Sequence, residues 1–378
     1  MHFAPFLLDD WLSHHQNSVP PIEFDLAAST GPTWTVRQLL ALDGADHRDE
    51  LLDTRLVYMR TQGTRALCQA IAEMEGARAE DIQITTGAAE ALLLLFTTAT
   101  APRANVLVSA LSFPAFYEIP RGLGLEVRHF HQRPENQFRV DLDEIKKLAD
   151  SNTKILMVNT PHNPSGATLT DDELTALHDF ATNRGIQFVS DQVYHPIYHG
   201  RPTATAARLP HATVLGDFSK ALCLAGLRLG WIVERDPHRM EQYRHAHGYF
   251  TVSGSALGET LAVIAVRNRE KIYARVREVA SANLALLDAF FTRHSQFFGW
   301  FRPQGGMTVF PWMKSGEDSR AFCAEAAEQG VLLAPGDCFG MPAHFRLGFA
   351  AAGEKFPQAL DRLSNFVEHR ATRAVAAR

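Results

Sequence analysis

The sequence is poor in cysteine and has no long apolar run. Only four of its 378 residues are cysteines and no two form a C-x-x-C pair, so neither a zinc ribbon nor a disulfide framework is predicted. Apolar stretches such as 91–96 are far shorter than the roughly 20 residues that cross a bilayer. The acidic start lacks the basic and apolar regions of a secretory signal. We therefore expect a cytoplasmic protein without a membrane partner.

Positive and negative charges are also nearly balanced in the sequence. The chain has 37 Lys+Arg against 42 Asp+Glu, a formal net charge of −5, and so has no broad cationic face for nucleic acid. Histidine is abundant, and His195 and His199 stand four residues apart. Pro196 lies between them and disfavours the continuous helix that would aim both rings at one metal. We expect neither a nucleic-acid partner nor a metal.

The middle of the chain alternates two patterns. Helical stretches, of which 170–183 is the clearest because Thr170 and Glu173 form a capping box, separate short runs rich in β-branched and aliphatic residues. The runs predicted to be strands are 82–85, 105–109, 125–130, 154–159, 186–190, 213–215 and 229–233. Such alternation predicts an α/β fold, a three-layer αβα sandwich around a mixed, mostly parallel sheet.

After about residue 256 the pattern changes to long helices with short strand-like pieces, which is typical of a smaller α+β domain. No linker or repeat interrupts the sequence, so we expect the two domains to pack together. The predicted division is an N-terminal segment, 1–45, that packs on the small domain, a large domain, 46–255, and a small C-terminal domain, 256–378.

Loops after the carboxyl ends of strands form the ligand sites of α/β sheets, and four such loops carry unusual residues. They contain Thr86-Gly87-Ala88-Ala89, Asn163-Pro164-Ser165-Gly166, Asp191-Gln192-Val193-Tyr194 and Ser219-Lys220, the last followed by Gly226-Leu227-Arg228-Leu229-Gly230. Each motif alone also fits an ordinary turn, cap or surface residue. Their order and spacing together resemble the class I and II aminotransferases, pyridoxal-phosphate enzymes of fold type I, over about residues 31–349.

The resemblance implies a function for each of these residue types around the cofactor, pyridoxal 5′-phosphate. Lys220 matches the lysine that holds the cofactor as a Schiff base and later moves a proton. Asp191 matches the carboxylate that keeps the ring nitrogen protonated. Asn163 and Tyr194 match the donors to the phenolic oxygen, and Phe113 matches the aromatic residue that stacks on the ring.

The resemblance also implies a phosphate site and a second subunit. The phosphate-binding residues are expected to be Ala88, Ala89 and Arg228, because a helix start and a guanidinium both attract anions. Gly87 and Ser219 are expected to be further cofactor-binding residues. Tyr58 matches a tyrosine that reaches the phosphate from the other subunit. We therefore expect a homodimer with two shared active sites.

On the substrate side, Arg346 matches the arginine that binds the substrate carboxylate, with Gly31 and Asn163 as further contacts. The implied substrates are L-amino acids and 2-oxo acids. Asp217 replaces a common Ser or Thr, and a carboxylate there would repel the phosphate. Either Asp217 contacts something else, such as a cationic substrate, or the phosphate site is rearranged. The motifs do not separate amino transfer from elimination or cyclisation. Residues 10–12, 134–138 and 159–166 are similar to the capreomycidine synthase branch, which favours cyclisation as the alternative.

Overall fold

A seven-stranded sheet forms the centre of the computed structural model, which describes residues 3–19 and 21–376. The strand order is β2-β8-β7-β6-β5-β3-β4, and only β8 runs antiparallel to its neighbours. The bounds are β2 (Ile82–Thr85), β3 (Asn105–Ser109), β4 (Glu126–Phe130), β5 (Thr153–Asn159), β6 (Gln187–Asp191), β7 (Thr213–Asp217) and β8 (Gly230–Val233). The predicted mixed, mostly parallel sheet is confirmed.

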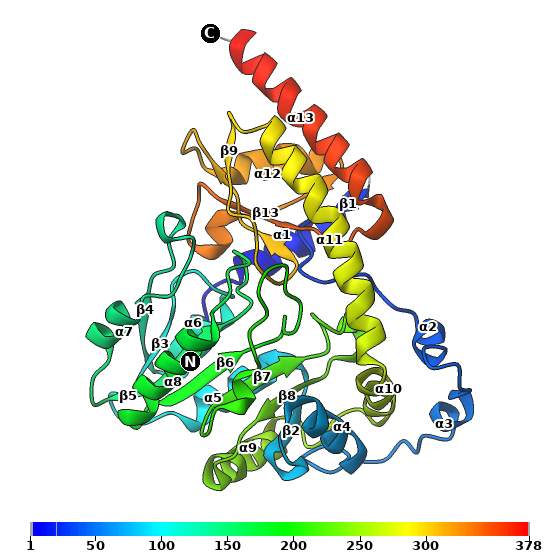
Figure 1. Ribbon diagram of the computed structural model, residues 1–378, viewed down its shortest axis with the longest axis vertical. Coiled ribbons are helices and arrows are strands. Elements are labelled where there is room, and N and C mark those ends of the chain that lie inside the picture. The colour runs from blue at the N-terminus through cyan, green and yellow to red at the C-terminus, as the bar shows by residue number, and fades with distance from the viewer. Residues whose placement is uncertain (1–2, 20, 377–378) are drawn as a thin grey trace.

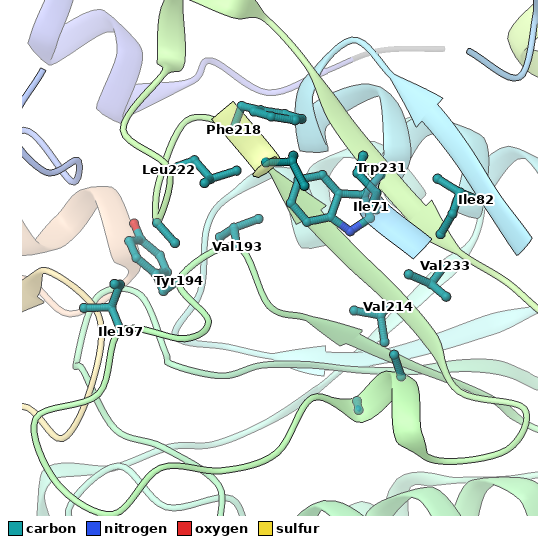
Figure 2. Close-up of a cluster of buried hydrophobic side chains, with 14 of the residues drawn as sticks. Ile71, Ile82, Val193, Tyr194, Ile197, Val214, Phe218, Leu222, Trp231 and Val233 are labelled. Atoms are coloured by element: carbon teal, nitrogen blue, oxygen red, sulfur yellow. The ribbon is translucent and has the colours of Figure 1, made fainter. Parts of the chain in front are cut away.

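Helices cover both faces of this sheet (Figure 1). Adjacent strand residues point to opposite faces, so Val214 belongs to one core and Leu215 to the other. One core also contains residues of α4 (Arg65–Glu75), α7 (Leu142–Leu148), α8 (Asp171–Asn183) and α10 (Ala256–Arg267), and Figure 2 shows part of it around Trp231. The other contains residues of α5 (Gly87–Thr98), α6 (Ala115–Gly122) and α9 (Pro237–Phe250). This is the predicted three-layer sandwich.

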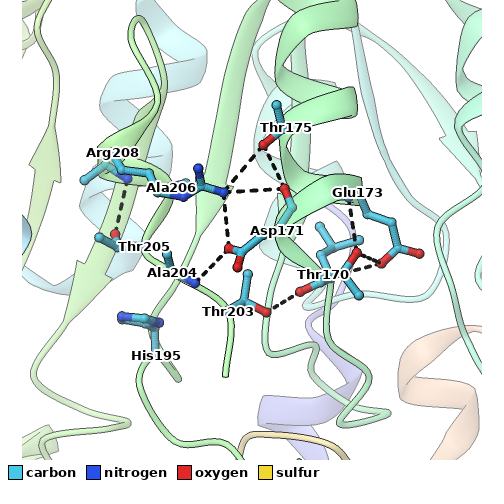
Figure 3. A network of polar contacts seen from close by, with 12 residues as sticks. Thr170, Asp171, Glu173, Thr175, His195, Thr203, Ala204, Thr205, Ala206 and Arg208 are labelled. Atoms are coloured by element: carbon cyan, nitrogen blue, oxygen red, sulfur yellow. Dashed lines mark hydrogen bonds and ion pairs between the residues drawn. The ribbon is translucent and has the colours of Figure 1, made fainter. Parts of the chain in front are cut away.

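A polar network at the start of α8 fixes the chain between β6 and β7 (Figure 3). The predicted capping box is present: Thr170 Oγ1 accepts from the Glu173 amide at 3.2 Å, and Glu173 Oε2 accepts from the Thr170 amide at 2.8 Å. Asp171 accepts from the Ala204 amide at 3.0 Å and from Arg208 at 3.2 Å. The segment that follows the β6 loop is therefore attached to the rigid end of a helix.

Besides the two cores on the faces of the sheet, a further apolar core joins the N-terminal segment to the C-terminal part of the chain. It is called the second core below. Strand β1 (Phe24–Asp25) pairs in parallel with β12 (Val331–Leu332). The other elements there are α1 (Leu7–Gln16), α11 (Arg269–Arg293), β9 (Phe298–Gly299), β10 (Thr308–Val309), β11 (Trp312–Met313), α12 (Ser319–Glu328), β13 (Ala334–Pro335), β14 (Phe345–Gly348) and α13 (Phe356–Ala376).

Helix α11 connects the two parts of the molecule. Its Ile272 and Val276 belong to the sheet core that contains Val214, whereas its Leu284 and Leu287 belong to the second core. The domain boundaries at 45 and 255 stay predictions, since this helix belongs to both parts. Two short helices, α2 (Val36–Leu40) and α3 (Arg48–Leu52), precede α4. Within residues 3–19 and 21–376, no helix has the length and apolarity to cross a membrane.

Candidate active site

A cavity of about 340 Å³ opens at the carboxyl ends of the central strands. Asn159, Asp191 and Asp217 are the last residues of β5, β6 and β7, and all three line it. Most of the residues singled out from the motifs meet here, although they lie far apart in the sequence. Those lining the cavity are Ala88, Ala89, Phe113, Asn163, Asp191, Tyr194, Ser219, Lys220, Arg228 and Arg346.

The amine of Lys220 points into this cavity. Its Nζ atom donates a hydrogen bond to Ser29 Oγ at 2.9 Å and lies 6.0 Å from the centre of the Tyr194 ring. The Tyr194 hydroxyl in turn donates to the carbonyl oxygen of Ser29 at 3.2 Å. Ser29 was not predicted: the motif argument selected Gly31 from the same segment. The structure places Ser29 and Thr30 at the cavity, while Gly31 packs against Cys223.

Asp191 is a buried carboxyl group without an ion pair in the described chain. Its Oδ1 accepts from the Val193 amide at 3.1 Å and from Asn159 Nδ2 at 3.2 Å. No described residue donates to its Oδ2. Burial raises the pKa of this carboxyl to about 7, because the charged form loses its hydration. A cationic group that entered the cavity beside Oδ2 would relieve this cost.

Asp217 is occupied by its own loop. Its Oδ1 accepts from the backbone amides of Ser219 at 3.0 Å and of Lys220 at 3.1 Å. Burial raises the pKa of this carboxyl, and the charge of Lys220 and these amides oppose that rise. This geometry favours a carboxylate that shapes the lysine loop rather than one that contacts a substrate.

The Arg228 guanidinium lies against the first residues of α5. Gly87 has a positive φ of 71°, and a side chain there would lie 3.3 Å from Arg228 Nη2, so the guanidinium sits directly against the helix start. A Cβ on Gly230, at the beginning of β8, would come within 2.9 Å of the Ala88 amide nitrogen. A side chain at either glycine would therefore crowd the start of α5. Helix-start amides beside a guanidinium are a combination that suits an anion.

Arg346 connects the two parts of the site. It lies on β14 and is buried, with Nη1 donating to Asn163 Oδ1 at 3.1 Å and Nη2 donating to the Ala27 carbonyl at 2.8 Å. Its Nε has no partner in the described chain. Burial lowers the pKa of the guanidinium, but an arginine stays charged. A buried cation with spare donors is suited to a carboxylate.

Two further observations concern aromatic residues. Phe113 lines the cavity and packs edge to face with Phe6, which precedes α1, at a ring separation of 5.6 Å. The sequence argument found Phe113 but not Phe6, because no motif that it used includes residues 6–9. Tyr58 is 86% exposed and does not line the cavity of this chain.

Comparisons with known proteins agree with this geometry. The sequence model of the family described as aminotransferase class I and II matches residues 43–363. The chain belongs to this family. It is 28% identical over 375 residues to capreomycidine synthase from Streptomyces vinaceus, covering 94% of this chain and 92% of the relative. The fold also matches a PLP-dependent aminotransferase from Streptococcus suis, with a TM-score of 0.91 and 27% identity, covering 98% and 99% of the two chains. A PLP-dependent cyclase, OrfR, gives a TM-score of 0.89 and 27% identity, covering 98% of both.

The class I and II aminotransferases use pyridoxal phosphate, and the cavity fits that cofactor. The open donors at the start of α5 suit the phosphate group. The free Oδ2 of Asp191 suits a protonated ring nitrogen, and the Lys220 amine suits the aldehyde carbon. The prediction that this chain is a pyridoxal-phosphate-dependent aminotransferase is therefore confirmed at the level of family, fold and cofactor.

Proposed function

We propose that the protein transfers amino groups between an L-amino acid and a 2-oxo acid, with Lys220 as the cofactor-binding lysine. Lys220, Asp191 and Arg346 all line one cavity, and this observation carries the proposal. An amine, a ring counter-ion and a carboxylate anchor are the three groups that amino transfer at pyridoxal phosphate requires. When bound, the cofactor supplies an electron sink for the bond between the substrate's Cα and its hydrogen.

Lys220 is proposed to carry the proton. With pyridoxal phosphate bound, the free Nζ would accept the proton from the substrate's Cα, leave the bonding electrons to the cofactor's electron sink, and later give the proton back. The hydrogen bond from Nζ to Ser29 Oγ, at 2.9 Å, holds the amine at the cavity wall. Ser29 is thus proposed as a positioning residue for the lysine.

Asp191 is proposed to hold the ring nitrogen in its protonated state. Its Oδ1 is oriented by the Val193 amide and Asn159, which leaves Oδ2 for the ring. Asn163 and Tyr194 are proposed as donors to the phenolic oxygen. This assignment is supported by Asn163 itself, because its Oδ1 accepts from Arg346 and its side-chain nitrogen Nδ2 donates to no other residue that the structure describes.

Arg346 is proposed to bind the α-carboxylate of the substrate. Its links to Ala27 and Asn163 fix the plane of the guanidinium, and its remaining N–H groups can reach two carboxylate oxygens.

Gly87, Ala88, Ala89, Ser219 and Arg228 are proposed to hold the phosphate, with Phe113 on the ring face. Gly31 packs away from the cavity. We therefore propose that it does not contact the substrate itself and only supports the neighbouring Ser29 and Thr30, which line the cavity.

A homodimer with shared sites is proposed from the exposed apolar residues. Leu56, Val57 and Tyr58 are 79%, 53% and 86% exposed, and Tyr249 is 90% exposed. The two segments are adjacent, because the Met59 amide donates to Ser253 Oγ at 3.2 Å. A continuous exposed patch of this kind is typical of a subunit interface. It supports the prediction that Tyr58 serves the partner's phosphate site.

A cytoplasmic location is also proposed. All four cysteines are buried and free of disulfides, as is usual for proteins of reducing compartments.

A second reaction is favoured by a specific observation. Capreomycidine synthase and the cyclase OrfR are both similar to this chain over nearly its whole length. The same three groups would serve an elimination followed by internal addition, if the substrate carried a leaving group at Cβ. Cyclisation is therefore kept as the alternative to amino transfer.

The reaction of the bound cofactor with an amino acid alone, without a 2-oxo acid, distinguishes amino transfer from cyclisation. The purified enzyme is incubated with a panel of L-amino acids, and pyridoxamine phosphate and 2-oxo acid are quantified. Amino transfer predicts equal amounts of both products with at least one amino acid. Consumption of β-substituted amino acids without any pyridoxamine phosphate would instead establish elimination or cyclisation.

A further inference from the structure

One wall of the active-site cavity is formed by the N-terminal helix α1 and the residue before it. Phe6, Leu8, Asp9 and Leu12 line the cavity. The helix is fixed in place by Trp11, whose Nε1 donates to the Leu333 carbonyl at 2.8 Å across the second core. The side chains of α1 are thus held at a constant position opposite the cofactor residues.

Asp9 is the one carboxylate of the described cavity lining that has no task in the proposed chemistry. Asp191 faces the ring position and Asp217 binds its own loop. Asp9 is exposed, and it forms no ion pair or side-chain hydrogen bond with any residue in 3–19 or 21–376. A carboxylate presented in this way is available to a ligand.

The cations of the lining are already assigned. Within the described chain they are Lys220, Arg228 and Arg346, which serve the aldehyde carbon, the phosphate and the α-carboxylate. No further cation of this chain is left there for an acidic substrate side chain. The electrostatics of the remaining space therefore favour a positive group over a negative one.

Apolar side chains line the space around Asp9. They include Leu8 and Leu12 of α1, Phe6 with its edge against Phe113, and Phe116. Such walls suit a methylene chain, while its charged end requires a polar partner. Lysine, ornithine and arginine side chains have this composition, an aliphatic stem with a cationic end.

We propose that Asp9 binds the cationic end of the substrate side chain, and that the protein acts on basic L-amino acids. This inference rests on the proposed function, because it takes Arg346 as the anchor of the α-carboxylate. Asp9 is then a specificity-determining residue, supplied by a helix that lies outside the family motifs.

Asp10 provides a matched control. Both acids lie in the first turn of α1, where the helix dipole favours negative charge, but Asp10 does not line the cavity. If Asp9 served only the helix, Asp9→Asn and Asp10→Asn would have the same effect.

The direct test measures binding rather than turnover. Calorimetry of the holoenzyme gives dissociation constants for 5-guanidinopentanoate and for its neutral analogue 5-ureidopentanoate, neither of which has an amino group to react. We expect the wild type to prefer the cationic ligand, and Asp9→Asn to reduce that preference about tenfold, as for a charge-assisted hydrogen bond. Asp10→Asn should leave the preference unchanged. Equal affinities in the wild type, or equal effects of the two variants, would overturn the proposal.

A second arm distinguishes this inference from the proposed function. Pyridoxamine phosphate formation is measured with arginine, lysine, citrulline and leucine. Reaction with arginine or lysine in preference to the neutral amino acids supports the role of Asp9, and the better of the two identifies a guanidinium or an ammonium group. Reaction with neutral amino acids alone refutes it while leaving amino transfer intact. Reaction with none of a full amino-acid panel refutes the proposed function itself.

Discussion

The Nζ atom of Lys220 lies 2.9 Å from the Oγ atom of Ser29, although 191 residues separate the two in the sequence. Ser29 follows β1, which pairs with β12 in the second core, whereas Lys220 follows β7 of the central sheet. The amine that we propose to hold the cofactor is therefore oriented by a segment from the other part of the molecule. Any movement of the N-terminal segment relative to the sheet would be transmitted to the lysine.

Replacement of Ser29 by alanine should slow the proton transfer without preventing cofactor binding. A single hydrogen bond contributes about 0.5–1.5 kcal/mol, so we expect kcat to fall about two- to tenfold with little change in KM. Steady-state kinetics of Ser29→Ala and Ser29→Thr check this. Threonine keeps the hydroxyl and should retain more activity than alanine. Equal kcat values for both variants would show that the hydroxyl does not position Lys220.

Asp191 should make the stability of the cofactor-free protein depend on pH. Its pKa is raised from an ordinary 3.8 to about 7 in the fold, so folding favours the protonated form. The stabilising contribution is complete below about pH 4 and is lost as the pH rises through 7. The amide side chain of an Asp191→Asn variant cannot ionise, so the stability advantage of this variant over the wild type should grow between pH 5 and pH 8.

This growth should be of the order of 3 kcal/mol in the free energy of unfolding. Between pH 5 and pH 7 the Asp191 carboxyl is ionised in the unfolded chain but protonated in the fold, and each pH unit of this interval contributes about 1.4 kcal/mol. Denaturant unfolding at both pH values measures it. Saturating pyridoxal phosphate should reduce the effect, because a protonated ring nitrogen beside Asp191 lowers its pKa. A pH-independent difference between variant and wild type would contradict the burial of an unpaired carboxyl.

Arg346 should be irreplaceable by lysine. An ammonium group cannot reproduce the planar fork that joins Asn163, Ala27 and a carboxylate. We expect Arg346→Lys to lose about ten- to a hundredfold in kcat/KM, corresponding to one charge-assisted bidentate contact. The absorbance of the bound cofactor should stay unchanged, which serves as the control for folding. A kcat/KM near the wild-type value would remove Arg346 from substrate binding.

Tyr58 should act across a subunit interface. When Tyr58→Phe and Lys220→Ala subunits are mixed, a shared tyrosine places both lesions in one site of each heterodimer and leaves the other site intact. Activity should then rise above that of either parent, to about half that of the wild type. Differently tagged subunits allow heterodimers to be isolated before the assay. Verified heterodimers that show no recovery would place Tyr58 outside the shared site.

The alternation of short apolar runs with helical stretches predicted the central sheet well. The strand at 105–109 matches β3, and the capping box at Thr170 begins α8 as expected. Both signals are local, since they depend on neighbouring residues or on the burial of a short run. The motif positions also lie where the carboxyl ends of strands meet, which follows from the parallel pairing of β5, β6 and β7.

The substrate side of the cavity could not be predicted in the same way. Ser29, Asp9 and Phe6 reach the site through long-range packing of α1 and β1 on the second core, and their own sequence neighbourhood contains no turn or cap that marks them. Asp217 shows the opposite problem. Its position in the motif suggested a ligand contact, but only the fold reveals that its carboxylate binds the amides of its own loop.

The proposed chemistry depends on Lys220 as the residue that carries the cofactor, and peptide mapping after borohydride reduction identifies the lysine that does so. Reduction fixes pyridoxal phosphate to the amine that holds it, and mass spectrometry then identifies the labelled peptide. We expect a single label on the peptide that contains Lys220, no label in Lys220→Ala, and an unchanged label in the exposed control Lys147→Ala. A label on another lysine of the wild type, or a stoichiometric label that persists in Lys220→Ala, would contradict it.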